Sequence, residues 1–515
     1  MNCAEEYQCL QGWRKKMSKE KYKLHPISAL INFVKVLKEM ILPLIVLLVV
    51  NGFGDDSNFW SGLFTYGIYA IVLLFMLVSG IIKWKRFRYW FEDGELRIEY
   101  GLFVKKKRYI PFDRIQSLNY TEGIFHRPFG LVKVKVETAG GGPTKEADAE
   151  LTAISKEAAE QIKKEIMLAK SQETPTLEEG IEITETMKEE KKPIFRMSTK
   201  ELLVLASTSG GVGVFFSGLA VFASQFSELI PYERIYNEIM IFIKFGVLMV
   251  ALVVFSVLLV AWAVSVLLTF INYYDFTIRI EDEEIIITRG LLEKKKITIP
   301  LTRIQGIRLV ENPLRQLTGY ATVTVDSAGG SMAEKDETIR LLPLIKKTEI
   351  NPILEEIFPE FQLQPSFERV PNKSRKFFYR LDLLWIIPVA AAVIYFFYPY
   401  GLLSLLLIPA SFGLGVWQKK TAGFYIEETQ LVAQYRLFSR VTVWMEKRRI
   451  QSMTARTTYF QKKSDVASIV VTIKSGVGGA ETVIPHIEKV DSEKLLSWYE
   501  PTRKSKTIIE KEQSE

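Results

Sequence analysis

The sequence predicts a membrane protein of mixed α and β structure. It should have six transmembrane helices in three hairpins, each followed by a small β domain closed by a helix. The first supporting observation is a repeat: residues 101–116 recur as 290–305, an offset of 189 (290 minus 101). A third copy keeps Leu437-Phe438 and Arg449-Ile450-Gln451. A repeat of this length is a domain-sized unit, larger than the short periods of solenoids.

The second observation is an apolar hairpin before each copy. Residues 63–82 are long enough to span a bilayer alone, whereas the run 40–50 before them is short and contains Pro43. A buried core helix is the alternative for such a run, but the repetition of the pattern favours membrane hairpins. The other predicted helices are 202–223, which follows a capping-box spacing at Ser198 and Glu201, 245–271, 383–398 and 402–417.

The third observation is strand patterning after each hairpin. Asp93-Gly94 is a hairpin turn signal, and Val132, Val134 and Val136 alternate with lysines as in a half-buried strand. A helix over 156–167 then follows. Several short strands and one terminal helix predict a small capped barrel.

These patterns divide the chain into ten segments. Met17 is a plausible start of translation, so residues 1–16 are expected to be an artefact of gene calling. No signal peptide is recognisable. The segments are a polar tail (1–25), hairpin 1 (26–83), the first β domain (84–168), an acidic linker (169–197), hairpin 2 (198–272), the second β domain (273–362), a linker (363–380), hairpin 3 (381–418), the third β domain (419–500) and a charged tail (501–515).

Charge asymmetry predicts the orientation in the membrane. Lysines and arginines flank the starts and ends of the hairpins, whereas the hairpin tips carry only Arg234. The positive-inside rule then puts both termini and all three β domains in the cytoplasm of a multi-pass protein of the cell membrane.

Residues suited to catalysis are scarce. His25, His126 and His486 lie far apart, and Cys3 and Cys9 cannot form a disulfide framework. No metal-ligand spacing and no nucleophile-base set is present. We therefore expect no enzyme activity, no metal, no cofactor and no nucleic-acid partner.

An Arg-x-Gln motif recurs in all three copies and has two interpretations. Arg can capture an anion, or the motif can be a hydrogen-bond anchor at a corner of the barrel. The third copy keeps the motif while losing the neighbouring lysines, so the structural interpretation is favoured. The residues are Arg114 and Gln116, Arg303 and Gln305, and Arg449 and Gln451.

A basic cluster recurs in the first two copies only. Lysines can protect an exposed edge strand from unwanted pairing. They can also attract anionic lipid head groups, at about 1 kcal/mol per basic residue near the surface. The candidates for head-group binding are Lys105, Lys106, Lys107, Arg108, Lys294, Lys295 and Lys296.

The order of motifs resembles the bacterial pleckstrin-homology (PH) family of small membrane proteins, and the three-unit arrangement resembles its YdbT-like branch. The motifs are Gly-Leu, then Ile-Pro-x-x-Arg-Ile-Gln, then a Val-x-Val strand ending in Ser/Thr-Ala-Gly-Gly. The resemblance covers nearly the whole chain from about Leu24, and it implies partly open β barrels with C-terminal helices. The third unit departs from the pattern, with Arg436 in place of Gly and Met445-Glu446 in place of Ile-Pro.

We therefore expect a non-enzymatic scaffold that presents three PH-like domains at the inner membrane surface. Its partners would be membrane lipids, anionic ones in particular, or a small single-PH-domain membrane protein of the same family, in envelope maintenance or stress protection. The alternative is a subunit of a transporter or channel complex. Such a subunit needs polar residues within the membrane, for which Lys244 is the main candidate.

Overall fold

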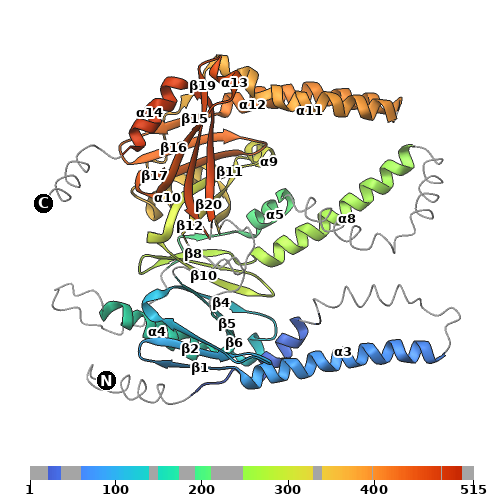
Figure 1. The fold of residues 1–515 in the computed structure, drawn as a ribbon, viewed down its shortest axis with the longest axis vertical. Coiled ribbons are helices and arrows are strands. Elements are labelled where there is room, and N and C mark those ends of the chain that lie inside the picture. Colours follow the sequence, from blue (N-terminus) through green and yellow to red (C-terminus); the bar gives the residue numbers. More distant parts are fainter. Residues whose placement is uncertain are drawn as a thin grey trace. The chain divides into compact units, whose positions relative to one another are not determined.

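The computed structural model describes residues 21–35, 37, 59–138, 149–172, 192–209, 247–328, 339–396, 398–476 and 478–500 (Figure 1). Several predicted features lie outside these residues. They are the start of the polar tail, the first apolar run, most of the acidic linker, the tip of hairpin 2 with Lys244, and the charged tail. The described part is mixed α and β, and its sheets are antiparallel.

The first β domain has two groups of three strands and a terminal helix. The predicted hairpin at Asp93-Gly94 is confirmed, because Trp90 faces Arg97 across it and both turn residues have positive φ angles. The elements are β1 (Arg88–Glu92), β2 (Glu95–Tyr100), β3 (Lys106–Pro111), β4 (Ile115–Glu122), β5 (Leu131–Thr138), β6 (Ala149–Ser155) and α4 (Lys156–Gln172).

The second and third β domains repeat this order of elements. The second has β8 (Thr277–Glu281), β9 (Glu284–Arg289), β10 (Lys294–Pro300), β11 (Ile304–Glu311), α9 (Pro313–Thr318), β12 (Tyr320–Ser327), β13 (Ile339–Lys346) and α10 (Lys347–Ile357). The third has β15 (Gly423–Ile426), β16 (Gln430–Arg436), β17 (Arg440–Glu446), β18 (Ile450–Arg456), α13 (Tyr459–Lys462), β19 (Val466–Ser475), β20 (Gly478–Glu488) and α14 (Lys489–Tyr499).

The core of the first β domain joins both strand groups to the terminal helix. Leu96 and Ile110 from the first group, Val134 and Leu151 from the second, and Ile162 of α4 belong to one buried cluster. Buried residues alternate along most of β5, as they do where one face of a sheet is buried. The third β domain has a core of the same kind, in which Phe424, Val443, Ile469, Ile484 and Leu495 are buried together.

Neighbouring β domains share continuous sheets, which the repeat did not predict. Strand β4 of the first domain pairs with β10 of the second, in a seven-stranded sheet of order β6-β5-β4-β10-β9-β8-β7. Strand β11 pairs with β17 in the same manner, in the order β13-β12-β11-β17-β16-β15-β14. The chain accordingly forms two compact units, and the boundary between them lies in the second β domain. Strand β8 belongs to the first unit and β11 to the second.

A short segment before each hairpin pairs with the first strand after it. We call these the clasp segments: Tyr22, β7 (Phe195–Arg196) and β14 (Glu368–Arg369). Tyr22 bridges to Tyr89, β7 pairs with β8, and β14 pairs with β15. The two ends of each predicted hairpin are therefore hydrogen-bonded to each other at a β domain.

Three of the described helices are long and apolar enough to cross a membrane. They are Leu252–Tyr273, Asn372–Phe396 and Gly401–Thr421, which correspond to the fourth, fifth and sixth predicted helices. The second predicted helix lies within α3 (Phe59–Arg86), where Ile71, Leu74 and Phe75 are exposed. The capping box opens α5 (Thr199–Thr208) as predicted, with the Glu201 amide donating to the Ser198 hydroxyl. The three spans contain most of α8 (Val247–Tyr273), all of α11 (Arg375–Phe396) and all of α12 (Leu407–Thr421).

Candidate functional site

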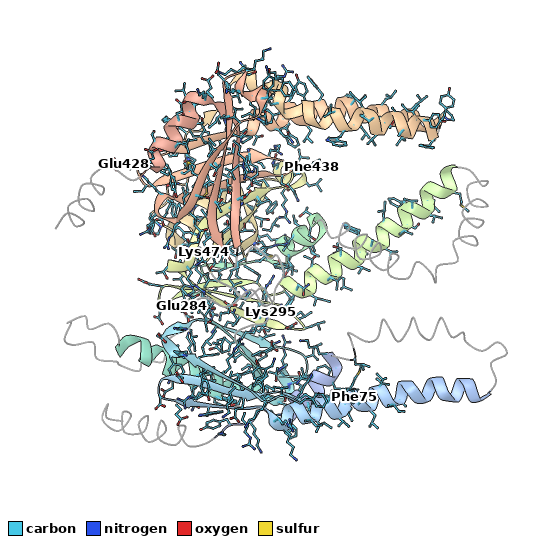
Figure 2. All side chains as sticks on the ribbon, viewed as in Figure 1. Phe75, Glu284, Lys295, Glu428, Phe438 and Lys474 are labelled. Carbon is cyan, nitrogen blue, oxygen red and sulfur yellow. The ribbon has the colours of Figure 1, made fainter. Side chains whose placement is uncertain are left out.

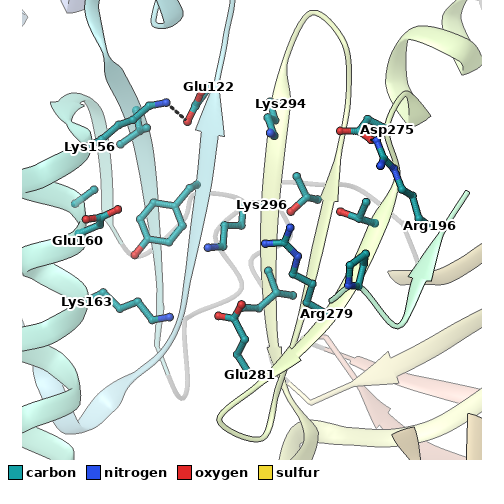
Figure 3. A pocket seen from close by; sticks show the side chains of 17 residues that line it. Glu122, Lys156, Glu160, Lys163, Arg196, Asp275, Arg279, Glu281, Lys294 and Lys296 are labelled. Carbon is teal, nitrogen blue, oxygen red and sulfur yellow. Dashed lines mark hydrogen bonds and ion pairs between the residues drawn. The ribbon is translucent and has the colours of Figure 1, made fainter. Parts of the chain in front are cut away.

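A basic cleft of about 500 Å³ lies where the first β domain meets the first strands of the second (Figure 3). We call it the junction cleft. Its walls come from β4 and α4 on one side and from β7, β8, β9 and β10 on the other. Its charged lining residues are Lys156, Lys163, Arg196, Arg279, Lys294 and Lys296, with the acids Glu122, Glu160, Asp275 and Glu281.

The strand geometry of β10 decides which predicted lysines reach the cleft. Successive side chains of a strand point to opposite faces. Lys294 and Lys296 line the cleft, whereas Lys295 between them does not. Lys163 of α4 lies two helical turns beyond Lys156, and both face the cleft.

The positive charge in the junction cleft is only partly neutralised. Lys156 pairs with Glu122 at 2.8 Å, and Arg196 pairs with Asp275 at 2.9 Å. Within the part of the chain that the structure describes, Lys163, Lys294 and Lys296 form no ion pair. Lys163 and Lys296 extend toward each other across the cleft (Figure 3). Like charges that face each other across a cleft favour a bound anion.

The first lysine triplet has different surroundings. Lys105, at 3.1 Å, and Lys107, at 3.6 Å, pair with the carboxylate of Glu99, which Lys21 also approaches. Burial alone would raise the pKa of Glu99, but the hydrogen bond and positive charge of Lys105, with Lys21 and Lys107, hold it below its ordinary value. Strand β3 ends its sheet, so the edge-strand interpretation applies to it, whereas β10 is an internal strand. Lys106 is exposed on β3, and Arg108 beside it is half-buried.

The Arg-x-Gln motif lies where each domain passes from its third to its fourth strand. Arg114, Arg303 and Arg449 each end a short 3₁₀ turn. Their surroundings differ: Arg114 is exposed, and Arg449 lies 3.5 Å from the Glu446 carboxylate. Among the glutamines, Gln305 is buried and donates to the Arg303 carbonyl oxygen at 3.0 Å, whereas Gln116 is half-buried and Gln451 is exposed. In the second domain the glutamine of the motif is therefore hydrogen-bonded to the backbone of the motif's arginine.

Both sheet junctions carry a glutamate that the sequence analysis did not single out. Glu122 faces Lys294 across the first junction and pairs with Lys156, the first residue of α4. Glu311 holds the same position in the second junction. It faces Arg440, accepts hydrogen bonds from it, and pairs at 2.6 Å with Lys347, the first residue of α10.

The electrostatics of Glu311 follow from these contacts. Its side chain is only 1% exposed, and burial alone would raise its pKa. The hydrogen bonds and charges of Arg440 and Lys347 outweigh burial and hold the pKa below the ordinary value. The equal spacing of Glu122 and Glu311 in the repeat was the signal that could have revealed this position.

The comparison with known proteins agrees with the threefold structure. A model described as Bacterial PH domain matches residues 42–170, 239–356 and 382–503. The chain belongs to the bacterial PH domain family. Each matched range begins within a predicted hairpin and ends within, or just beyond, the helix that closes its β domain.

A curated relative has the same extent as this protein. The UPF0699 transmembrane protein YdbT of Bacillus subtilis (strain 168) is 36% identical over 496 residues, which cover 94% of this chain and 99% of the relative. The protein is thus a transmembrane protein with repeated bacterial PH domains. The predicted resemblance is confirmed along nearly the whole chain.

The third bacterial PH domain lacks the glycine that the first two domains share, and the structure shows what replaces it. Gly101 and Gly290 adopt φ angles of +132° and +109°, and a β-carbon there would meet a backbone oxygen of the same turn. In the third domain Arg436 replaces this glycine and stacks on Trp417 of α12, with 3.8 Å between the guanidinium carbon and the ring centre. It also donates to Thr421, the last residue of α12, and to Gln316 of α9.

His486 is packed among structural residues of the third domain. Burial lowers the pKa of His486 to about 4, so its ring is neutral near pH 7. It lies edge-on to Phe378 of α11 with 4.8 Å between ring centres, and its Nδ1 is 2.8 Å from the Gln461 amide nitrogen. The described residues contain no group of three histidine, cysteine or acidic side chains that could hold a metal ion.

Proposed function

We propose that this protein is a non-enzymatic membrane scaffold that holds three PH domains against the inner surface of the cell membrane. Six helices in three hairpins would anchor it, with both termini in the cytoplasm. Lipid head groups, or a small single-PH-domain membrane protein of the same family, would be its partners in envelope maintenance or stress protection. Co-purification from native membranes would identify that protein partner.

The clasp segments carry this proposal. A segment before each hairpin pairs with a strand after it, through Tyr22 and Tyr89, Phe195 and Ile278, or Glu368 and Phe424. A hairpin whose two ends are paired outside the membrane must cross it an even number of times. Three such hairpins leave all three β domains on one side, and the positive-inside rule assigns that side to the cytoplasm.

Cysteine labelling in intact cells tests this topology. In a chain whose Cys3 and Cys9 are replaced by Ser, a membrane-impermeant maleimide should label Ser227→Cys in the tip of hairpin 2. It should label Glu428→Cys, exposed between β15 and β16, only after the cells are opened. Labelling of Glu428→Cys in intact cells would place the third β domain outside and contradict the proposal.

The junction cleft supports an anionic head group as the lipid ligand. It includes Arg196 of a clasp segment and Asp275, which follows the end of α8 at Tyr273. The cleft therefore reaches the level at which the second hairpin meets its β domain. Unpaired Lys163, Lys294 and Lys296 there would contact a phosphate oxygen.

Lipid retention by the full-length protein tests the cleft. The double variant Lys163→Gln/Lys296→Gln removes two charges worth about 1 kcal/mol each near a lipid surface. It should weaken retention of phosphatidylglycerol in detergent by roughly 30-fold. Lys295→Gln, which removes the same charge from the other face of β10, should retain the lipid.

Two comparisons make this test decisive. Free inorganic phosphate that displaces the lipid at equal concentration would assign the cleft to a soluble anion. Equal lipid loss in the double variant and in Lys295→Gln would contradict a specific role for the cleft.

A further inference from the structure

Each β domain has an exposed apolar residue at the tip of its second hairpin. Phe103, Leu292 and Phe438 occupy the same repeat position, and each follows a leucine. Their exposed fractions are 83%, 45% and 65%. The lysines that follow in the first two domains are missing from the third, so the apolar pair is the property that all three tips share.

A second loop in each domain repeats the pattern. Phe125, Leu314 and Phe460 lie at equivalent positions between the fourth and fifth strands, and all three are exposed. Exposed apolar residues on soluble surfaces are normally scattered singly. Here they recur at two equivalent positions in all three domains.

The hairpin tips are bonded to the ends of membrane-region helices. The Arg86 guanidinium of α3 donates to the Leu102 carbonyl at 2.5 Å, and the Leu291 amide donates to the Ile271 carbonyl of α8 at 2.9 Å. In the third domain the Gln418 amide of α12 donates to the Leu437 carbonyl at 3.1 Å. Each tip therefore lies beside the end of its helix that is nearer to the β domain.

The second loops also lie near helices of the predicted hairpins, although not always near the helix that their own tip contacts. The ring of Phe129, in the same loop as Phe125, is centred 5.8 Å from that of His25, just before the helical residues 27–35. In the second domain Gln316 of α9 bonds Arg436, which stacks on Trp417 of α12. In the third domain Gln461 of α13 is hydrogen-bonded to His486, and the His486 ring packs edge-on against Phe378 of α11.

From this placement we infer that the two loops of each domain insert their apolar side chains into the lipid interface, and that this contact sets the depth of the domain. The inference rests on the proposed membrane topology. It differs from attraction by the lysines, since all three domains would take part and the contact would persist when charge is screened. Amphipathic surface segments bind a bilayer by the same burial of apolar area.

Fluorescence quenching in lipid nanodiscs tests the inference with residues of known placement. Single-cysteine variants of the full chain, lacking Cys3 and Cys9, would carry an environment-sensitive dye. A dye on Phe438→Cys reports on a tip, and a dye on Phe75→Cys reports on the middle of α3. A dye on Glu428→Cys reports on the face of the third domain away from its tip (Figure 2). The nanodiscs would hold phosphatidylcholine and phosphatidylglycerol, with a nitroxide on the acyl chains near the head groups to quench positions 438 and 428, and near the chain ends to quench position 75.

The dye on Phe438→Cys should lose most of its fluorescence, whereas the dye on Glu428→Cys should lose none. The loss should be the same at 1 M salt, where charges are screened beyond about 3 Å. Equal signals at positions 438 and 428, while position 75 is quenched, would overturn the inference alone. A loss at position 438 that disappears at high salt would also overturn it, because the lysines would then hold the domain. An unquenched dye at position 75 would instead overturn the topology on which the inference rests.

Discussion

Replacing Glu311 by Gln is expected to lower the stability of the second sheet junction by about 2 kcal/mol. Glu311 is buried, and the substitution leaves Arg440 and Lys347 without their acid. Breaking a fully buried pair costs more, but the two basic side chains here keep about a third of their surface exposed, at 32% and 37%. Urea unfolding of the detergent-solubilised chain, followed by tryptophan fluorescence, should show the lower midpoint.

The first junction supplies the matched control for this change. Glu122→Gln alters the equivalent residue, but Glu122 is 24% exposed and its partner Lys156 is 51% exposed. A pair this accessible contributes about 0.5 kcal/mol. Equal losses from the two substitutions would show that burial does not distinguish the two junctions.

The pH dependence gives a second readout for Glu311. Its pKa in the folded protein is below the ordinary value. Its contribution is therefore complete above the unfolded pKa, about 4.3, and is lost as the pH falls through the lower folded value. Stability of the wild-type junction should decline on acidification below about pH 4.3. Glu311→Gln should remove that part of the decline.

Replacing Arg436 by Ala is expected to lower the stability of the third PH domain by about 3 kcal/mol. The guanidinium is buried over the Trp417 ring and donates to Thr421, to the Phe438 carbonyl and to Gln316. A desolvated cation–π contact and charge-assisted hydrogen bonds are lost together. The midpoint of thermal unfolding should fall, and the turn at Phe438 should become more accessible to protease.

Arg448→Ala is the control within the same domain. Arg448 is 65% exposed and pairs with Glu446 and Glu360 at the surface. Solvent screens such pairs, so the substitution should change the midpoint very little. A shift as large as that of Arg436→Ala would mean that loss of positive charge, and not of the Arg436 contacts, destabilises the domain.

Local patterns predicted the elements of the fold well. Asp93-Gly94 forms the turn of the first hairpin, the alternating valines lie in β5, and the repeat indicates the second and third domains. These features depend on residues close together in the sequence. The first span, the tip of hairpin 2 and the candidate Lys244 lie outside the described residues.

The pairing between domains could not be predicted in this way. A repeat shows that units are alike, but not which edge of one unit meets the next. Lys294 and Lys296 therefore looked equivalent to Lys105 and Lys107, although one pair lines a cleft and the other surrounds Glu99. Glu122 and Glu311 seemed to be ordinary acids for the same reason, because their partners lie on other elements.

The shared sheets also bear on how such a protein can gain or lose repeats in evolution. Both junctions join a strand that ends in glutamate to a strand that begins with a basic residue: Glu122 faces Lys294, and Glu311 faces Arg440. Deletion of the whole middle repeat would bring β4 opposite β17, with Glu122 facing Arg440. Complementary charge and hydrogen-bonding edges would be kept, so the number of domains can change by whole units without a new interface.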